Sequence, residues 1–427
     1  MKTLRQNNGL AQPQHFTISD MNTQYMIQTG KTLFKGMEYE DLKRLQFNIE
    51  STGLSLTDSE ILIICYTCGD KSDYIIGDEN FIIEHFFEVI KRLNPDVIES
   101  YNGFSFDFQL LMNRAAVHDI RPNIGRNNSD MYMFQTHIRM GDNQSVEIMV
   151  PKIWGRHCVD LYYSVRAWDA IYRELETYKL DDVSERFGKK FEDMNIDKTK
   201  IAEFLKTDKQ LIIKHCMDDC LAVDHLSKLL TQKDFYQTQM LPMNYEKVCI
   251  ASSSTKMTGM FVREYYRQGH AIPIKQEKID FEGAMVGAEQ RGIFEHVYHL
   301  DVNSLYPSVM LNYNVCPKSD KFKVFPKLLK TLTDLRFSMK AQAKETGLER
   351  YKAEEQSTKI LINSLYGLLG SNVFQWNDME EASRVTKIGR ETLQTMCDFL
   401  TKKGYITLER DTDGVYITKE SWQSQEK

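Results

Sequence analysis

The stretch at residues 297–308 reads Val-Tyr-His-Leu-Asp-Val-Asn-Ser-Leu-Tyr-Pro-Ser. Its β-branched and aromatic start predicts a strand, and the Asn-Ser pair with the later proline predicts the first turn of a helix. Asp301 then lies at the end of the strand, where its carboxylate can face a crevice, and Tyr306 lies in the first helical turn. Taken alone, an Asp in this place is more typical of a cap or a turn.

Further acids lie near the end of the chain, where residues 405–409 and 415–418 have the pattern of two strands joined by a turn. Asp411 and Asp413 lie at the tip of this predicted hairpin. Together with Asp301, they could hold two divalent cations through oxygen ligands. In-line phosphoryl transfer requires such an arrangement.

Two long helices, at residues 323–344 and 349–371, are predicted between these acids and form an antiparallel hairpin. The spacing of several side chains places them on one face of the second helix: Lys359, Asn363, Tyr366, Gly367 and Gly370. Arg336 and Lys340 are one turn apart on the first helix. Such a face can hold a triphosphate and lie flat against a base pair, although a solvated face and ordinary core packing are the plainer interpretations.

The first half of the chain alternates between predicted strands and helices, which indicates an α/β domain at about residues 41–230 after a lead-in at 1–40. The expected strands are 45–50, 60–66 and 96–101. The expected helices are 81–93, one that begins at Asp107, 177–187 and 209–230. A helix at 252–267 and another at 380–403 are expected in the second half.

Polar residues suited to metal chemistry recur in this α/β domain. Asn48 and Glu50 share one face of a strand, Asp107 begins a helix, and His215 lies one turn before Asp219. A shared site is possible from this spacing, but helix caps and surface acids explain each residue singly.

Length, composition and charge limit the class of protein and argue against a membrane-spanning or secreted chain. The chain has 427 residues, 42% hydrophobic and 27% charged, so about two to four domains are expected. It has no run of 18 apolar residues and no apolar segment of the signal-peptide kind, so we expect a cytoplasmic protein with no membrane partner, a nuclear location being left open. The net charge of −6 does not indicate nucleic-acid binding, although the distribution of charge decides that question.

The eight cysteines offer two metal-like pairs, Cys65 with Cys68 and Cys216 with Cys220. Both pairs lie in apolar stretches with no second pair nearby in sequence. Buried thiols are therefore a better interpretation than a zinc site.

Three motifs, in order, closely resemble motifs A, B and C of the family B DNA polymerases. They are Asp-Val-Asn-Ser-Leu-Tyr-Pro-Ser at 301–308, Lys-Ile-Leu-Ile-Asn-Ser-Leu-Tyr-Gly at 359–367 and Asp-Thr-Asp at 411–413. Upstream, Phe-Glu-Gly-Ala at 281–284 looks like the family's linking Tyr-x-Gly-Gly segment. Three further groups sit at its exonuclease motifs: Asn48 with Glu50, Asn102 with Phe106 and Asp107, and His215 with Asp219. The resemblance covers about residues 41–418.

This resemblance implies a multidomain chain of α/β and α+β class. An RNase H-like 3′–5′ exonuclease domain at 41–230 would precede a linker and the first part of a palm at 231–320, helical-hairpin fingers at 321–372, and the rest of the palm, with its antiparallel sheet, at 373–427. It implies DNA-templated synthesis of DNA from dNTPs on a primer-template, with two Mg²⁺ ions that Mn²⁺ could replace. A bacterial, archaeal or phage-encoded enzyme is expected.

The resemblance also implies roles for single residues. Asp301 and Asp411 would be metal ligands, Asp413 a third acid, and Tyr306 would stack under the deoxyribose. The expected nucleotide-binding residues are Ser304, Leu305, Tyr306, Arg336, Lys340, Lys359, Asn363, Tyr366 and Gly367. The expected exonuclease site comprises Asn48, Glu50, Asp107, His215 and Asp219, with Glu50, Asp107 and Asp219 as metal ligands.

Departures from the family pattern limit these expectations. Asn48 stands where the family has Asp, which predicts weak or absent proofreading, and His215 stands where it has Tyr. Near motif C, Glu409, Arg410 and Gly414 replace the usual Tyr, Gly and Ser, and Arg410 could pair with Glu409 or with DNA phosphate.

The sequence ends just after motif C, where the family continues into a thumb. We therefore expect low DNA affinity and poor processivity. A separate or downstream thumb segment and a processivity factor are the possible partners. The alternatives are a catalytically weak or inactive DNA-binding fragment, or one piece of a split polymerase. A function as exonuclease alone is disfavoured by Asn48.

Overall fold

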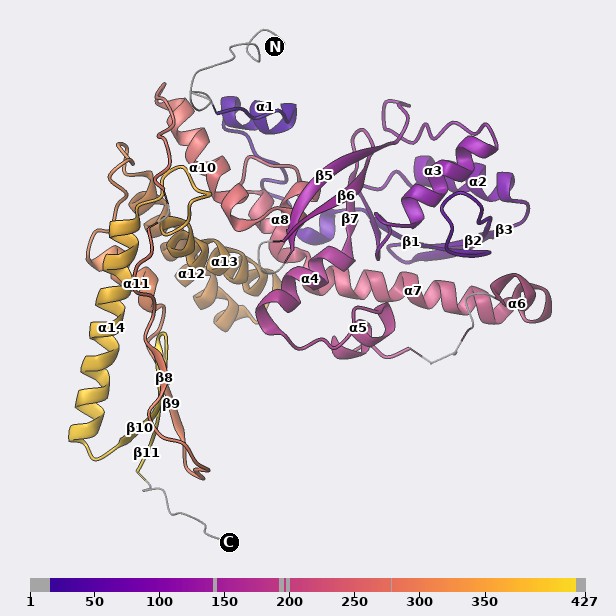
Figure 1. Ribbon diagram of the computed structural model, residues 1–427. Helices are drawn as coiled ribbons and strands as arrows, with labels where there is room; N and C mark the ends of the chain where they lie inside the picture. Colours follow the sequence, from indigo (N-terminus) through magenta and orange to yellow (C-terminus); the bar gives the residue numbers. More distant parts are fainter. Residues whose placement is uncertain (1–15, 141–143, 192–195, 197–199, 278, 420–427) are drawn as a thin grey trace. The chain divides into compact units, whose positions relative to one another are not determined.

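The computed structural model describes residues 16–140, 144–191, 196, 200–277 and 279–419 (Figure 1). The chain divides into two compact units. One unit comprises Thr32–Ser252, and the other combines Met1–Lys31 with Ser253–Lys427. Among the described residues, no helix is long and apolar enough to span a membrane.

A five-stranded sheet forms the centre of the unit at 32–252, in the order β3-β2-β1-β4-β7. Its strands are β1 (Arg44–Ser51), β2 (Ile61–Cys68), β3 (Lys71–Ile76), β4 (Val97–Ser100) and β7 (His157–Asp160). Strands β1, β2 and β3 are antiparallel, while β4 and β7 run parallel to β1. Because β1 and β2 are covered on both faces, they are almost continuously buried.

Helices cover the two faces of this sheet, as Figure 1 shows. Helices α2 (Glu79–Leu93) and α3 (Asp107–Val117) contribute to the larger core, where Phe47 packs against Phe86 and Phe108. Helix α7 (Lys209–Leu230) contributes Ile212 and Cys216 to a smaller core on the other side. Since neighbours on a strand alternate between faces, Asn48 lies on the α7 side.

The remaining elements of this unit are shorter or lie outside the sheet. A separate two-stranded sheet pairs β5 (Tyr132–Met140) with β6 (Gln144–Lys152). The other elements are η2 (Tyr39–Asp41), α4 (Leu161–Tyr172), α5 (Leu180–Arg186), α6 (Ile201–Thr207), α8 (Gln232–Thr238) and α9 (Tyr245–Ile250). The sequence predicted no bounds for strands β3, β5, β6 and β7 or for helices η2, α4, α6, α8 and α9.

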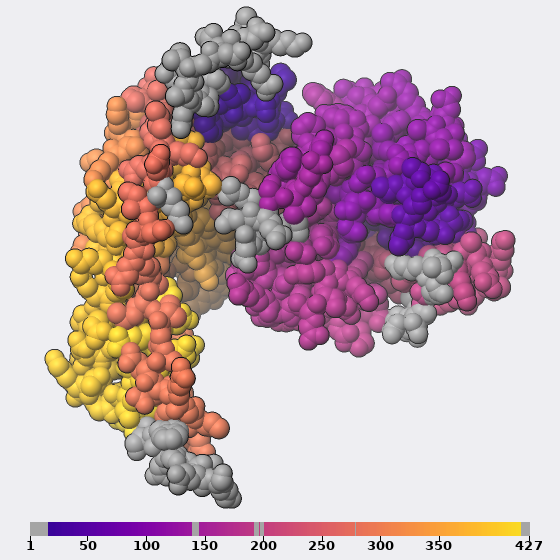
Figure 2. Space-filling view, in the orientation of Figure 1, coloured from indigo at the N-terminus to yellow at the C-terminus, as the bar shows by residue number. Residues whose placement is uncertain are grey.

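The other unit contains a four-stranded antiparallel sheet in the order β8-β10-β11-β9. Its strands are β8 (Val286–Ala288), β9 (Tyr298–Asp301), β10 (Ile406–Asp411) and β11 (Gly414–Thr418). Figure 2 shows the salmon chain of β8 and β9 lying along the yellow chain of the C-terminal strands. Helix α14 (Met379–Lys402) packs on this sheet through Leu393, Cys397 and Leu400, which meet Val415 and Ile417.

Helices flank the end of the sheet where Asp301 lies. Helix α11 (Leu305–Asn312) follows β9 after a short turn, and α12 (Val324–Thr346) and α13 (Glu349–Leu369) form the expected hairpin. The turn between them begins at Gly347, which has a left-handed backbone with φ of 70°. Helix α1 (Met21–Thr29) lies against α10 (Ser253–Arg267) in the same unit.

Candidate active sites

The strand-to-helix stretch at 297–308 has the predicted form. Asp301 is the last residue of β9, and it pairs in register with Gly414 of β11. The next residue, Val302, donates its backbone N–H to the carbonyl oxygen of Asp413 at 2.7 Å. Ser304 then adopts a left-handed conformation with φ of 55° and begins α11. This local geometry brings the end of β9 next to the acidic turn.

The acidic turn joins β10 to β11 through two residues, Thr412 and Asp413, between the paired residues Asp411 and Gly414. Thr412 has φ of 54°, a conformation that favours glycine, so the turn is locally strained. Its backbone N–H donates to the carbonyl oxygen of Met285 at 3.0 Å. This hydrogen bond fixes the strained turn to the residue directly before β8.

The carboxylates at this end of the sheet influence one another. Burial raises the pKa of Asp413, and the nearby charges of Asp301 and Asp411 raise it further. Like charges gathered in this way are relieved by a cation, and carboxylate oxygens are the ligands that Mg²⁺ prefers. The donor set of these three residues therefore fits divalent magnesium.

A cavity of about 320 Å³ opens beside these acids. Helices α11, α12 and α13 supply most of its lining, which comprises Asp301, Asn303, Ser304, Leu305, Tyr306, Pro307, Arg336, Lys359, Ile362, Asn363, Tyr366 and Asp413. Seven of the nine expected nucleotide-binding residues are in that lining. Of the other two, Lys340 is exposed on α12 and Gly367 is exposed on α13.

Two aromatic rings form one wall of this cavity. The rings of Tyr306 and Tyr366 have centroids 4.3 Å apart and an interplanar angle of 35°. Burial, with Tyr306 nearby, raises the pKa of Tyr366 to about 12. Behind Tyr306 lies Gly389 of α14, where an added Cβ would be 3.1 Å from the ring. The ring of Tyr306 is therefore held between α13 and α14.

The two basic side chains at the cavity, those of Arg336 and Lys359, differ in their surroundings. The Arg336 Nε donates to Glu355 Oε1 at 2.7 Å, and its Nη1 donates to Ser304 Oγ at 3.0 Å. The guanidinium thus links α12 to α13 and to the start of α11. Lys359, in contrast, has an exposed side chain at the cavity.

The segment at 281–284 is fixed to α14 by contacts that sequence reasoning missed. Arg390 Nη1 donates to the carbonyl oxygens of Glu282 and Gly283, at 2.9 and 2.5 Å. Thr386 Oγ1 donates to the carbonyl oxygen of Glu282 at 2.9 Å. The only sequence signal was that Thr386 and Arg390 are one helical turn apart.

Arg410 has side-chain partners within its own unit. Its Nη2 lies 3.0 Å from Glu289 Oε1, and its Nη1 donates to Gln394 Oε1 at 2.8 Å. Glu409, one of the two partners considered from the sequence, is not among these described contacts. The reason is that Arg410 faces β8 and α14, where these contacts lie. The other partner considered from the sequence, DNA phosphate, stays a prediction.

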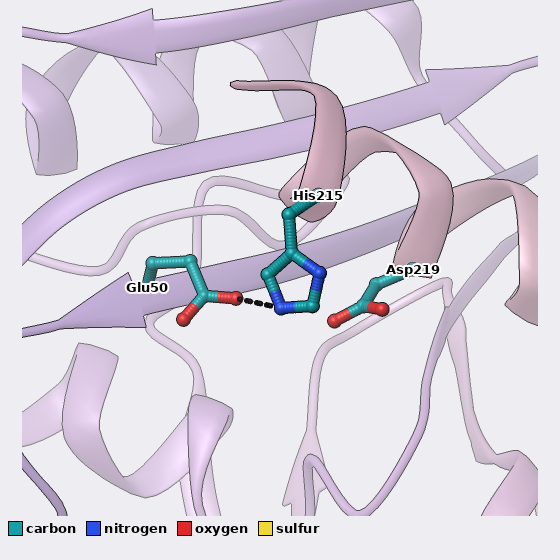
Figure 3. A group of neighbouring side chains, drawn as sticks. All are labelled: Glu50, His215 and Asp219. Carbon is teal, nitrogen blue, oxygen red and sulfur yellow. Dashed lines mark ion pairs between the residues drawn. The ribbon is translucent and has the colours of Figure 1, made fainter. Parts of the chain in front are cut away.

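The candidate exonuclease site lies between β1 and α7 in the other unit. Asn48 Nδ2 donates to Glu50 Oε1 at 3.2 Å and to Asp219 Oδ2 at 3.1 Å. His215 Nε2 lies 3.7 Å from the same oxygen of Glu50 (Figure 3). Four of the five expected residues are therefore brought together by one strand and one helix.

Asp107 is the fifth expected residue, and it is held differently. Its Oδ1 accepts the backbone N–H of Ile49 at 3.3 Å, and only 5% of its surface is exposed. Burial raises the pKa of Asp107 to about 8, with the charges of Asp160 and Glu50 contributing. Its role as a metal ligand stays a prediction.

The cysteines of the two sequence pairs are all buried free thiols. Cys65, Cys216 and Cys220 share the small core beside α7, and Cys220 Sγ lies 3.2 Å from the carbonyl oxygen of Cys65. Cys68 lies in the larger core on the opposite face of β2. This packing agrees with the interpretation of buried thiols.

Comparison with known proteins gives consistent matches along the chain. Residues 62–183 match a family model described as DNA polymerase family B, exonuclease domain. Residues 243–320 and 317–422 match a model described as DNA polymerase family B.

Similar proteins include a DNA polymerase of Archaeoglobus fulgidus, 28% identical over 415 residues, which cover 90% of this chain and 51% of that protein. A DNA polymerase of Pyrococcus glycovorans is 30% identical over 446 residues, covering 92% and 55%. The chain thus spans about half the length of the curated relatives it matches.

The fold is similar to that of a solved structure, the family B DNA polymerase from Pyrobaculum calidifontis. The TM-score is 0.75 at 21% identity, and the match covers 93% of this chain and 60% of that one. The predicted fold class, α/β and α+β in several domains, is confirmed.

Proposed function

The chain belongs to DNA polymerase family B, and we propose that it catalyses DNA-templated transfer of nucleotides from dNTPs to the 3′-hydroxyl of a primer. One observation carries this proposal. A single cavity is lined by Asp301 and Asp413, by the cations Arg336 and Lys359, and by the ring of Tyr306. Nucleotidyl transfer needs acidic side chains that bind metal ions and basic side chains that bind the triphosphate. It also needs a flat surface against which the sugar can lie.

The chemistry is one of positioning and electrostatics. When bound, two Mg²⁺ ions, or Mn²⁺ in their place, would be held by Asp301 and Asp411 beside Asp413 and would supply activation of the attacking hydroxyl and neutralisation of the leaving pyrophosphate. Lys359 and Arg336 contact the triphosphate in this proposal, with Asn363 in support. No covalent intermediate with the protein is expected.

The start of α11 adds donors to this arrangement. Backbone N–H groups at a helix N-terminus suit phosphate oxygens, and residues 303–306 supply them here. Tyr306 stacks under the deoxyribose, while Tyr366 and Gly367 face the nascent base pair. Lys340, one turn from Arg336 and exposed, interacts with phosphate only at longer range.

We assign the domains on the same premise. Residues 41–230 form the exonuclease domain, 231–320 a linker and the first part of the palm, 321–372 the fingers, and 373–427 the rest of the palm. In the exonuclease domain, Asn48 offers an amide in place of a carboxylate, so proofreading is weak or absent.

Primer extension tests the proposal directly. The chain with Mg²⁺ and dNTPs should extend a primer, and Asp301→Asn and Asp411→Asn should each lower the rate by about 10³-fold, since losing a metal ligand removes several kcal/mol of transition-state stabilisation. The control is Glu391→Gln, which removes an exposed acid from α14 of the same unit and should keep the rate. A chain that binds primer-template DNA but never extends the primer would instead support the DNA-binding alternative.

A further inference from the structure

Three side chains converge between β1 and α7 in a way that the polymerase reaction does not explain. Glu50 comes from β1, and His215 and Asp219 are one turn apart on α7. Each offers a ligand atom, and these atoms all lie within 4.8 Å of one another (Figure 3). Glu50 and Asp219 are only 4% and 8% exposed, so water contributes little to neutralising them.

A second observation points to a ligand at the same place. The Nε2 atom of His215 is buried and has no hydrogen-bond partner among the described residues. Its nearest acid partner is Glu50 Oε1, at 3.7 Å. Buried nitrogen atoms of this kind are rare without a partner, and a metal ion is one that imidazole nitrogen commonly takes.

The spacing also suits a shared ion. Two atoms that bind one ion at about 2.0–2.2 Å are about 3.0–3.6 Å apart. The distance between Glu50 and His215 is close to this range, and the ligand atoms of all three residues lie within 4.8 Å of one another, so side-chain rotations that draw them together would form the site.

The contacts of Asn48 indicate how many cations this group of side chains can balance. Its amide nitrogen lies between the carboxylates of Glu50 and Asp219 and donates to both, at 3.2 and 3.1 Å. A neutral amide leaves the charge of two carboxylates in this group, which a single divalent cation balances. An Asp at this position would add a third negative charge and favour a second ion.

We propose that Glu50, His215 and Asp219 bind one divalent transition-metal ion, of the Mn²⁺ or Zn²⁺ class, in preference to Mg²⁺. Imidazole suits transition metals, whereas Mg²⁺ prefers oxygen ligands and keeps several waters. This site differs from the Mg²⁺ ligands Glu50, Asp107 and Asp219 that the family resemblance implies. It is independent of the proposed polymerase activity because its residues belong to the unit at 32–252.

Binding of Mn²⁺ to the full chain tests this proposal. Asp301→Asn and Asp411→Asn are introduced together, so that the polymerase site no longer competes for the ion. Electron paramagnetic resonance should then count about one bound Mn²⁺, and pulsed spectra should show coupling to an imidazole nitrogen. Zn²⁺ should displace this Mn²⁺, while Mg²⁺ in large excess should leave most of it bound.

Histidine variants give the decisive comparison. In His215→Gln, the nitrogen coupling should disappear and the Mn²⁺ affinity should fall by about tenfold or more. His137→Gln, which alters an exposed histidine of the same unit, should change neither. If His215→Gln lowers the melting temperature, Glu50→Gln gives a second test and should weaken Mn²⁺ binding while the imidazole remains. No bound Mn²⁺, a coupling that survives in His215→Gln, or equal displacement by Mg²⁺ would overturn the proposal, whatever the result of primer extension.

Discussion

Gly367 lies inside α13 without a structural reason for being glycine. It is exposed, and an added Cβ would meet nothing within 4 Å. A glycine inside a helix costs about 0.5–1 kcal/mol relative to alanine. Gly367→Ala should therefore raise the melting temperature of its unit by about 1–4 °C. If Gly367 faces the nascent base pair as proposed, the same change should slow nucleotide incorporation.

The matched control for this prediction is Gly389→Ala in α14. There the added Cβ would lie 3.1 Å from the ring of Tyr306, so no gain in melting temperature is expected. Thermal unfolding and single-turnover incorporation separate the two effects. A Gly367→Ala chain that is more stable and equally active would remove Gly367 from the site.

If Tyr306 stacks under the deoxyribose as proposed, its ring leaves no room for the 2′-hydroxyl of a ribonucleotide. Its ring is held by Tyr366 on one side and Gly389 on another, so it cannot easily move away from a 2′-hydroxyl. Tyr306→Ala should lower the preference for a dNTP over the matching NTP by about 10–200-fold, the range of a steric contact. The measurement is kcat/KM for both substrates. Tyr306→Phe keeps the ring and should keep the preference; a Tyr306→Ala enzyme that still rejects NTPs would contradict this role.

At the residue scale, the sequence predicted what lies within motifs and missed what depends on distant neighbours. Asp301, Tyr306 and Asp413 line one cavity, and each lies at a strand end, a helix start or a tight turn that the sequence predicted. Glu355 and Arg390 were missed because their partners are far away in sequence. No local pattern distinguishes such an acid or base from one on a solvated face.

At the scale of elements, Asp378 connects the start of α14 to a distant segment. One carboxylate oxygen accepts the backbone N–H of Glu381 at 3.1 Å, and the other accepts that of Lys318 at 2.9 Å. The residue is 1% exposed, so both donors would lose their partner in Asp378→Ala. We expect a loss of about 1–3 kcal/mol in the stability of this unit.

Thermal unfolding measures this effect. Asp398→Ala removes an exposed acid from the same helix and should shift the melting temperature little, since surface changes stay within about 0.5 kcal/mol. Equal melting temperatures for Asp378→Ala and Asp398→Ala would show that the cap contributes nothing.

The elements that were predicted well have strong patterns of their own. Helix α7 begins and ends at the predicted residues 209 and 230, because its apolar positions repeat with helical spacing between a capping Asp208 and Thr231. The pair β5 and β6 was missed, although its strands have nine residues each. It forms a sheet of only two strands with exposed rings at Tyr132 and Phe134, so it lacks a clear alternation of apolar and polar residues.

For the whole molecule, the sequence indicated the order of the two candidate sites but could not show how each site is assembled. The exonuclease motifs fall in the unit at 32–252, and the polymerase motifs fall in the other unit. What the motifs alone could not show is that the Asn48 amide lies between Glu50 and Asp219. That contact depends on β1 and α7 meeting across a long interval of sequence.

The separation of the two sites into two units gives a last prediction. Asn48→Asp restores a carboxylate between Glu50 and Asp219, so the site gains negative charge and should bind Mg²⁺ more strongly. Degradation of single-stranded DNA from its 3′ end, measured with Mg²⁺, should rise by about tenfold or more over the unchanged chain. The rate of correct dNTP incorporation should stay the same, because Asp301 and Asp411 lie in the other unit. In the control, Asp219→Asn is added to Asn48→Asp and should abolish the gain. If Asn48→Asp alone brings no degradation, the amide is not what limits the site, and the site is inactive for another reason.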